Sequence, residues 1–400
     1  MDETKSVPKL RFEFPSNWKN KKLKDIIQIS KEKYNPDSDK TSYKCIELEH
    51  LSQGNGMLLG FTDSNEQNSI KNKFHEGNIL FGKLRPYLEK YYFPNFDGVC
   101  SSEIWVFDTK EYPKYIYYLI QTKRFLDIAN VSSGSKMPRS DWNFMKDFIF
   151  PIPNIKTQKE TSNLFTTIDK KIELLEKKHQ KYQDFKKYLM QQIFAQKLRF
   201  KRDSSYSSYK LKDIVTKFST GLNPRKNFKL NEGGENFYVT IKNFQNGILN
   251  LDEKCDKIDD NALKLINKRS DLQKDDLIFA SIGRVGEVYL IKDKPLNWNI
   301  NESVFSLRPN KQLIEPKFLY YLLNSNKVQN YFESNITGST FKSIKMKDLK
   351  NTPVTIPDSF ELQNEMIKFL TSVDSKILLI DDELNNMINF KKGLLQQMFV

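Results

Sequence analysis

Two long stretches of the chain carry apolar residues at alternating spacings of three and four positions. They cover about residues 158–197 and 361–399, and Gly393 is the only glycine or proline in either. This spacing is typical of a coiled-coil seam, so each stretch is predicted to be one long helix that packs on another helix. The predicted seam residues are Phe165, Ile168, Ile172, Leu175, Tyr182, Leu189 and Ile193 in the first helix, and Leu370, Val373, Ile377, Ile380, Leu384, Met387, Leu394 and Met398 in the second.

The chain before each predicted helix has a mixed pattern. β-rich runs such as 237–241 alternate with short helical stretches such as 316–324, and turns containing Gly or Asn-Gly separate them. Both segments are therefore predicted to be globular α/β (α+β) domains. The predicted boundaries are a first domain at 1–155, a first helix at 156–197, a linker at 198–208, a second domain at 209–357 and a second helix at 358–400.

The same unit occurs twice in the chain. Lys-Leu-Arg-Phe at 9–12 recurs at 197–200, and Lys-Leu-Lys-Asp-Ile at 22–26 recurs at 210–214. Further matches follow in the same order through the domains and the helices, so an internal duplication with approximate two-fold symmetry is predicted. The second copy departs from the first in one respect, because no Lys-Leu-Arg-Phe segment follows the second helix.

The lengths of the segments predict how the two helices run. A helix of about 38 residues is about 57 Å long, whereas a linker of about 11 residues reaches at most about 37 Å. The second domain is therefore expected near the far end of the first helix. If the matching seams pair with each other, the helices are antiparallel and the domains lie at opposite ends. That arrangement suits two half-sites on DNA.

The net charge leaves the partner open. The chain has 64 Lys and Arg against 50 Asp and Glu, which gives a net charge of +14. An excess of cations favours a polyanionic partner such as DNA. Lysine far outnumbers arginine, however, and Asn and Ile are also abundant, so a biased genomic base composition explains the charge equally well.

Cysteine usage and the first residues favour the cytoplasm. Cys45, Cys100 and Cys255 are far apart and form no Cys-x-x-Cys pair, which argues against disulfides and cysteine zinc sites and fits a reducing compartment. The N-terminal residues include early acids and no apolar core, unlike a signal peptide. No uncharged apolar run approaches the roughly 18 residues that span a bilayer. We expect a soluble cytoplasmic protein that binds no metal.

The order of these motifs resembles the specificity subunit of type I restriction–modification systems over essentially the whole chain. The segments behind the resemblance are 8–12, 18–26, 77–87 and 133–139, the second-copy counterparts 276–286 and 337–340, and the helix starts at 158 and 363. The resemblance implies two target recognition domains on a helical spacer, which bind an asymmetric bipartite sequence in double-stranded DNA. It also implies two modification (methyltransferase) subunits that use S-adenosylmethionine. Two restriction (translocase and endonuclease) subunits would use ATP and Mg²⁺, with no cofactor in this chain.

Polar and basic loop residues are the candidate DNA contacts. Arginine can hold a guanine edge at two atoms, asparagine suits adenine, and lysine and serine suit phosphates. A solvated loop is the alternative at each position. The candidates are Lys83, Arg85, Tyr87, Ser135, Lys136 and Arg139 in the first domain, and Asn223, Arg225, Lys226, Lys242, Asn243, Gly283, Arg284, Ser339, Thr340 and Lys342 in the second.

Familiar catalytic motifs are missing from the sequence. It has no Gly-x4-Gly-Lys-Ser/Thr phosphate loop, no Asn-Pro-Pro-aromatic or Asp-Pro-Pro-aromatic tetrad, no Gly-x-Ser-x-Gly and no His-Glu-x-x-His. We therefore predict a DNA-recognition and scaffolding subunit rather than an enzyme. Two alternatives stay open. One is a coiled-coil adaptor that joins proteins without touching DNA, and the other is a self-sufficient nuclease built on carboxylates such as Asp97 and Glu103.

Overall fold

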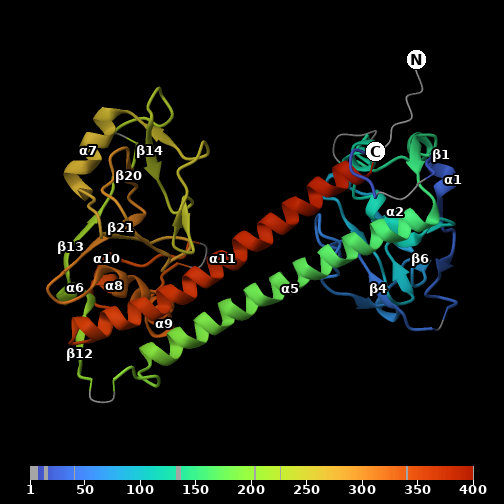
Figure 1. Ribbon diagram of the computed structural model, residues 1–400. Helices are drawn as coiled ribbons and strands as arrows, with labels where there is room; N and C mark the ends of the chain where they lie inside the picture. The colour runs from blue at the N-terminus through green and yellow to red at the C-terminus, as the bar shows by residue number, and fades with distance from the viewer. Residues whose placement is uncertain are drawn as a thin grey trace. The chain divides into compact units, whose positions relative to one another are not determined.

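The chain forms two compact units, which are Met1–Lys177 with Asp381–Val400, and Lys178–Ile380 (Figure 1). Each unit combines one globular domain with segments of both long helices. The units therefore divide both helices, whereas the predicted boundaries kept each helix in one piece. The structure is a computed structural model that describes residues 8–12, 17–39, 41–131, 137–201, 204–225, 227–338 and 341–399.

Both predicted long helices are present, as α5 (Ile155–Phe194) and α11 (Phe360–Met398). In the first unit, Phe165 near the start of α5 shares a hydrophobic core with Leu395 near the end of α11. In the second unit, Leu189 near the end of α5 shares a core with Leu370 near the start of α11. The helices are therefore antiparallel in each unit, as predicted, and every predicted seam residue is buried or half-buried.

The first domain contains two sheets, short helices and a closing strand pair. Its strands are β1 (Lys19–Lys22), β2 (Ile27–Ile29), β3 (Lys33–Tyr34), β4 (Lys44–Ile46), β5 (Thr62–Asp63), β6 (Lys71–Phe74), β7 (Ile79–Gly82), β8 (Tyr91–Tyr92), β9 (Gly98–Cys100), β10 (Ile104–Thr109) and β11 (Ile149–Ile152). Its helices are α1 (Leu23–Ile26), η1 (Leu48–His50), η2 (Ser64–Glu66), η3 (Pro86–Leu88), α2 (Pro113–Leu119), α3 (Lys123–Ala129) and α4 (Trp142–Met145). The sheet orders are β2-β10-β7-β8 and β3-β6-β9-β4-β5, and β1 pairs with β11.

The second domain also has a four-stranded sheet and a closing strand pair, but its remaining strands are arranged differently. Its strands are β12 (Tyr206–Lys210), β13 (Val215–Thr220), β14 (Asn236–Val239), β15 (Phe244–Gln245), β16 (Ile248–Leu249), β17 (Lys257–Ile258), β18 (Leu277–Ala280), β19 (Val288–Leu290), β20 (Trp298–Ile300), β21 (Val304–Pro309) and β22 (Pro353–Pro357). Its helices are α6 (Leu211–Ile214), α7 (Asp260–Ser270), α8 (Pro316–Leu323), α9 (Asn326–Ser334) and α10 (Met346–Lys350). The sheet orders are β13-β21-β18-β19, β17-β14-β20, β15-β16 and β12-β22.

The closing strand pair begins and ends each domain. Lys19 of β1 lies opposite Ile152 of β11, and Tyr206 of β12 lies opposite Pro357 of β22, both in antiparallel pairs. The chain thus leaves each domain beside its first strand and enters a long helix directly. β12 begins inside the predicted linker 198–208, so the linker is shorter than predicted.

A central strand of each domain separates two hydrophobic cores. In β7, Ile79 faces the core that includes α5 and α11, and Leu80 faces the core under the five-stranded sheet. In β18, Leu277 and Ile278 face the two corresponding cores. Because successive strand residues point to opposite faces, a strand covered on both sides is apolar throughout. The loops that follow β7 and β18 carry several of the candidate DNA contacts.

The first turn of each long helix contains a buried glutamine that joins three segments. The Gln158 side-chain oxygen accepts a hydrogen bond from the Tyr112 N–H at 2.8 Å, and its amide nitrogen donates to the Pro153 carbonyl at 2.8 Å. Gln363 makes the same two hydrogen bonds to the equivalent segments, at 2.9 and 3.0 Å. A buried amide with both ends paired avoids the cost of an unsatisfied polar group. It therefore fixes how α2 and α8 meet the long helices.

A carboxylate shared by three segments docks the first domain on the helix pair. The Tyr118 hydroxyl of α2 donates to Asp169 of α5 at 2.8 Å, and Lys391 of α11 pairs with the same carboxylate at 2.7 Å. Lys391 is buried and also donates to Gln121 at 3.1 Å. Burial raises the pKa of the Tyr118 hydroxyl, which keeps it protonated as a donor.

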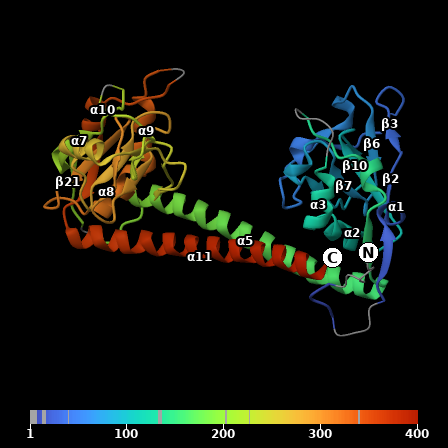
Figure 2. The same cartoon turned by 90° about the horizontal axis from the view of Figure 1, so that it is seen from above.

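The second domain repeats this contact at the equivalent positions. Tyr321 of α8 donates to Asp374 of α11 at 2.6 Å, and Lys186 of α5 pairs with Asp374 at 2.7 Å. α8 lies beside the first turns of α11 in both ribbon views (Figure 1, Figure 2). Each domain is thus held by one helix from each copy of the repeat.

The Lys-Leu-Arg-Phe segment caps a long helix in both units. After α5, the Leu198 N–H donates to the Gln192 carbonyl at 3.1 Å. At the end of α11, the Leu10 N–H donates to the repeat-equivalent Gln397 carbonyl at 3.0 Å, and Phe12 packs on the first domain's core. The N-terminal segment therefore occupies on α11 the place that residues 197–200 occupy on α5.

The two domains differ beyond this shared part. In both, an aspartate caps the turn that follows an antiparallel edge strand: Asp63 accepts from the Asn65 N–H at 2.9 Å, and Asp259 from the Ala262 N–H at 2.7 Å. The first domain then forms only the single turn η2 and adds β6 to its sheet. The second forms the 11-residue α7 instead. Among the described residues, no helix is both long and apolar enough to cross a membrane.

Candidate nucleic-acid interface

Two loops of the first domain are hydrogen-bonded side by side. The Arg85 N–H donates to the Pro138 carbonyl at 2.8 Å, and the Ser140 N–H donates to the Lys83 carbonyl at 2.9 Å. Arg85 is exposed in a left-handed conformation (φ 51°) that starts η3, and Tyr87 on the next turn is also exposed. The predicted contacts Lys83, Arg85, Tyr87 and Arg139 therefore belong to one surface.

The second domain pairs the equivalent loops in the same way. The Gly283 N–H donates to the Lys342 carbonyl at 2.8 Å, and the Ile344 N–H donates to the Ser281 carbonyl at 2.9 Å. Gly283 has a positive φ of 71°, a conformation that glycine adopts without strain. The structure thus brings Gly283, Arg284 and Lys342 together.

A third segment joins this surface in the second domain. The Arg284 guanidinium donates to the carbonyls of Ile241 and Phe244, at 2.6 and 3.0 Å. Asn243 closes the same turn by accepting the Thr240 N–H at 2.8 Å. The turn leaves Lys242 exposed beside Arg284, so both belong to one basic cluster. The Asn243 side-chain oxygen is already used within the turn.

Arg139 has an internal partner. Its guanidinium makes two hydrogen bonds to the Glu103 carboxylate, at 3.0 and 3.1 Å. This paired geometry is the strong form of the arginine–carboxylate interaction, and the Arg139 hydrogen bond lowers the pKa of Glu103. Arg139 therefore holds its loop in place, and a DNA contact by this side chain would compete with Glu103.

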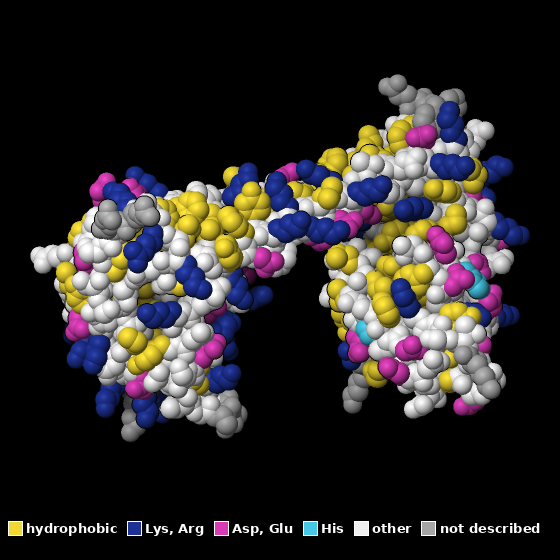
Figure 3. All heavy atoms as spheres, turned by 90° about the horizontal axis from the view of Figure 1, so that it is seen from below, with side chains coloured by type: hydrophobic (Ala, Val, Ile, Leu, Met, Phe, Trp, Pro, Cys, Tyr) yellow, Lys and Arg dark blue, Asp and Glu magenta, His cyan; other side chains and the backbone are white. Residues whose placement is uncertain are grey.

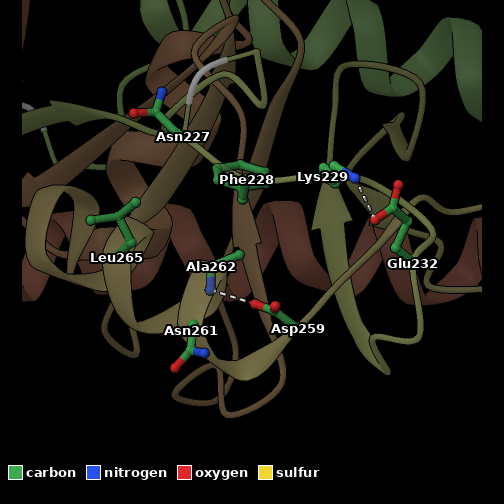
Figure 4. Close-up of a pocket in the computed structure, with 8 residues that line it drawn as sticks. All are labelled: Asn227, Phe228, Lys229, Glu232, Asp259, Asn261, Ala262 and Leu265. Atoms are coloured by element: carbon green, nitrogen blue, oxygen red, sulfur yellow. Dashed lines mark hydrogen bonds and ion pairs between the residues drawn. The ribbon is translucent and has the colours of Figure 1, made fainter.

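Asn223 and Arg225 lie on the segment between β13 and β14. On this segment, Leu222 and Phe228 pack against a small core that α7 shares with β14 and β17. Figure 4 shows Asn227 and Phe228 beside a pocket at the start of α7, with Lys229 paired to Glu232 at 3.1 Å. Among the described residues, no hydrogen bond or ion pair joins Asn223 or Arg225 to the loops around Arg284.

Five predicted contacts lie outside the described residues. They are Ser135, Lys136, Lys226, Ser339 and Thr340. Sequence reasoning also missed two features of the surface, namely the Glu103–Arg139 pair and the binding of Arg284 to the 240–244 turn. Neither has a local signal, because the partners are separated by 36 to 43 positions in the chain.

The carboxylates considered for a nuclease site have structural partners, and the thiols are buried. Asp97 lies 3.3 Å from the His75 ring, whose other nitrogen lies 3.1 Å from Glu32. The described residues contain no group of three or more His, Cys, Asp or Glu side chains arranged to hold a metal ion. Burial raises the pKa of Cys45 and of Cys255 to about 11, so both thiols stay protonated and are poor nucleophiles.

Known proteins share this sequence pattern. The family model for the type I restriction modification DNA specificity domain matches residues 15–183 and 204–389. The putative type I restriction enzyme MjaX specificity subunit of Methanocaldococcus jannaschii is 24% identical over 96% of this chain and 93% of its own length. The type I restriction enzyme EcoBI specificity subunit of Escherichia coli is 28% identical over 35% of this chain and 31% of its own length.

Solved structures share the fold. One chain, from work described as the structural basis of complex assembly and conformational transition of the type I R-M system, has a TM-score of 0.60. Its identity is 16%, and the match covers 97% of each chain. The type I restriction–modification S subunit from M. genitalium has a TM-score of 0.56 at 16% identity over 99% of each chain. Because the family model matches both repeats and most of the chain, this protein belongs to the family of type I restriction–modification specificity subunits.

Proposed function

We propose that this subunit recognises an asymmetric bipartite sequence in double-stranded DNA, one half-site per target recognition domain. The observation that carries the proposal is the repeated pairing of basic loops, with Arg85 against Pro138 in one domain and Gly283 against Lys342 in the other. Paired loops with exposed cations can hold phosphates and present side chains to base edges. Two such surfaces in one chain fit two half-sites.

The asymmetry of the target follows from the difference between the domains. Near the helices the domains share their contacts, but the segment after Asp63 forms η2 and β6 whereas the segment after Asp259 forms α7. Different elements present different side chains to a DNA groove. Two identical half-sites would need no such difference, so we infer two different half-sites.

The long helices carry surface that suits partner subunits. Leu174 and Phe390 are exposed on the first unit, and the repeat-equivalent Leu379 and Phe185 are exposed on the second. In each unit one residue comes from α5 and the other from α11. Hydrophobic side chains are visible along the helices in Figure 3. Exposed apolar side chains often mark protein interfaces, and their occurrence at equivalent helix positions of both units suits two copies of one partner, which we identify as the modification subunit.

Catalysis is assigned to the partners. Modification subunits would bring S-adenosylmethionine, and two restriction subunits would bring ATP and Mg²⁺, while this chain contributes recognition and scaffolding in the cytoplasm. The buried, protonated thiols and the internally paired carboxylates support a non-catalytic role.

The proposal is tested by DNA selection from a random-sequence pool. The chain is co-expressed with its modification subunit, and bound duplexes are sequenced at two or more salt concentrations. We expect two short motifs at one fixed spacing, with affinity that falls as salt rises because phosphate contacts release counterions. A stable protein complex that enriches no sequence would favour the adaptor alternative. Metal-dependent cleavage by this chain alone would favour the nuclease alternative.

A further inference from the structure

Both recognition domains expose a large apolar side chain at the same loop position. Met137 comes directly before Pro138, and Phe341 comes directly before Lys342, the two residues whose carbonyls accept the loop-pairing hydrogen bonds. Met137 is 50% exposed and Phe341 is 78% exposed. Neither belongs to the hydrophobic cores or to the residues packed against them. The same loop position thus exposes a large apolar side chain in both copies of the repeat, which indicates a shared task.

Hydrogen bonds and one close backbone approach fix the described residues around Phe341. Thr337 and Ser343 exchange two hydrogen bonds, at 2.9 and 3.0 Å, which bring the two ends of this loop together. Gly338 has a φ of +91°, and a Cβ there would lie 2.5 Å from the Phe341 carbonyl oxygen. The Ile344 N–H donates to the Ser281 carbonyl, which joins the Phe341 loop to the loop that follows β18. Phe341 is therefore exposed next to described backbone segments that hydrogen bonds fix.

Basic residues neighbour both apolar residues along the paired loops. Arg85 is hydrogen-bonded through its backbone to the residue that follows Met137, and Lys342 itself follows Phe341. Arg284 lies next to Gly283, which is bonded to Lys342. An exposed apolar side chain with basic residues beside it in the loops suits DNA, whose stacked apolar bases lie between two phosphate backbones. It complements a neutral or basic protein surface less well.

We propose that Met137 and Phe341 act as wedges that insert between base pairs beside each half-site, while the neighbouring cations hold the phosphates. The inference rests on the proposed function and adds a deformation step to it. Apolar wedges of this kind partly unstack a base step and bend the duplex. A methyltransferase must extrude its target base, and a step that is already unstacked lowers the cost of extrusion. This task is common to both half-sites, which explains why the position is shared although the distal elements differ.

The test uses the complex with its modification subunit and a duplex that carries the selected target. 2-Aminopurine is placed in turn at each base step of the half-sites and of the bases beside them, since its fluorescence rises on unstacking. Phe341→Ala is expected to abolish the rise at the second half-site only, and to weaken binding about tenfold. Met137→Ala is expected to do the same at the first half-site only.

Two variants serve as controls. Phe341→Met places in the second domain the side chain that the first domain uses, and we expect it to keep the fluorescence rise. Leu296→Ala removes another apolar side chain of the second unit, 82% exposed, and we expect no change. Unchanged fluorescence and affinity in Phe341→Ala would overturn the wedge. So would loss of the modification subunit from Phe341→Ala without DNA, which would indicate a protein contact. Failure of the wild-type complex to select any target would instead refute the proposed function itself.

Discussion

The two recognition domains are nearly the same beside the long helices and different away from them. Beside the helices, Gln158 and Gln363 make the same hydrogen bonds, and Asp169 and Asp374 each bind a tyrosine and a lysine. Away from them, one domain completes a five-stranded sheet and the other has three strands and α7. The shared part attaches a domain to the helix pair, which is the same task twice. Under the proposed function, the divergent part recognises a different half-site in each domain.

The largest expected effect is the loss of stability caused by a cavity in the core of either unit, which should be seen for that unit alone. Phe165 and its repeat equivalent Leu370 are both fully buried, each in the core of its own unit. Phe165→Ala should destabilise the first unit by about 3–5 kcal/mol and Leu370→Ala the second by about 2–5 kcal/mol, because each leaves a cavity. Urea unfolding should show one transition shifted in each variant. Equal shifts of the whole curve in both variants would mean that the units do not unfold separately.

The shared carboxylates provide a more direct comparison of the two docking contacts. Side-chain exposure is 11% for Lys391 and 34% for Asp169, against 31% and 27% in the Lys186–Asp374 pair. Lys391→Ala should lower the free energy of unfolding by about 2 kcal/mol, because it leaves the Asp169 carboxylate without its paired cation. Lys186→Ala should lower the free energy of unfolding by about 1 kcal/mol, because the Lys186–Asp374 pair is more accessible to water.

Lys392→Ala, at the exposed position next to Lys391, serves as the matched control and should leave the unfolding free energy nearly unchanged. If Lys186→Ala lowers the unfolding free energy as much as Lys391→Ala does, the exposure of the pair does not set the strength of the contact.

The arginines of the loops test whether each domain binds its own half-site. Arg85→Ala and Arg284→Ala should each lower the affinity for the selected target by about 5- to 100-fold, the range for one lost base or phosphate contact. Sequences selected by Arg85→Ala should change only in the first motif, and those selected by Arg284→Ala only in the second. Lys294→Ala, on an exposed loop of the second domain, should change neither motif. A change in both motifs from one arginine variant would argue against separate readout.

The smallest effect concerns pH and should occur in the first domain alone, because the second domain contains no histidine. Hydrogen bonds to Glu32 and Asp97 raise the pKa of His75 above its ordinary value of 6.5. The contribution of protonated His75 to the stability of the first domain is therefore complete below about pH 6.5, and it is lost as pH rises through the folded-state pKa of His75. Since the ring is about half exposed, we expect only a few tenths of a kcal/mol. His75→Gln should abolish this slope in unfolding measurements from pH 6 to 8, and a slope that persists would point to another group.

The sequence predicted the features that depend on local periodicity and on repetition. The three-and-four spacing from Phe165 to Ile193 was enough to place α5, because a helix that packs on another must repeat its apolar face. The repeated Lys-Leu-Lys-Asp-Ile predicted that α1 and α6 have equivalent places. Antiparallel pairing followed from chain length and matching seams.

Contacts between distant segments could not be predicted in this way. Arg139 pairs with Glu103, and the Leu10 N–H caps α11 at Gln397, although nothing near these residues in the chain signals a partner. The partition of α5 and α11 between the two units was also missed, because it depends on how each domain packs on both helices. The apolar Met137 lay inside a motif, and its exposure became visible only once the fold was known.

The central claim is that each domain recognises its own half-site while the helices set a common spacing. A chimaeric chain tests it most directly, in which residues 206–357 are replaced by a second copy of 19–152, the matching span between closing strands. Selection from a random pool, with the modification subunit present, should yield two copies of the first wild-type motif at the wild-type spacing. A folded, assembled chimaera that still selects the second wild-type motif, or only one motif, would contradict it.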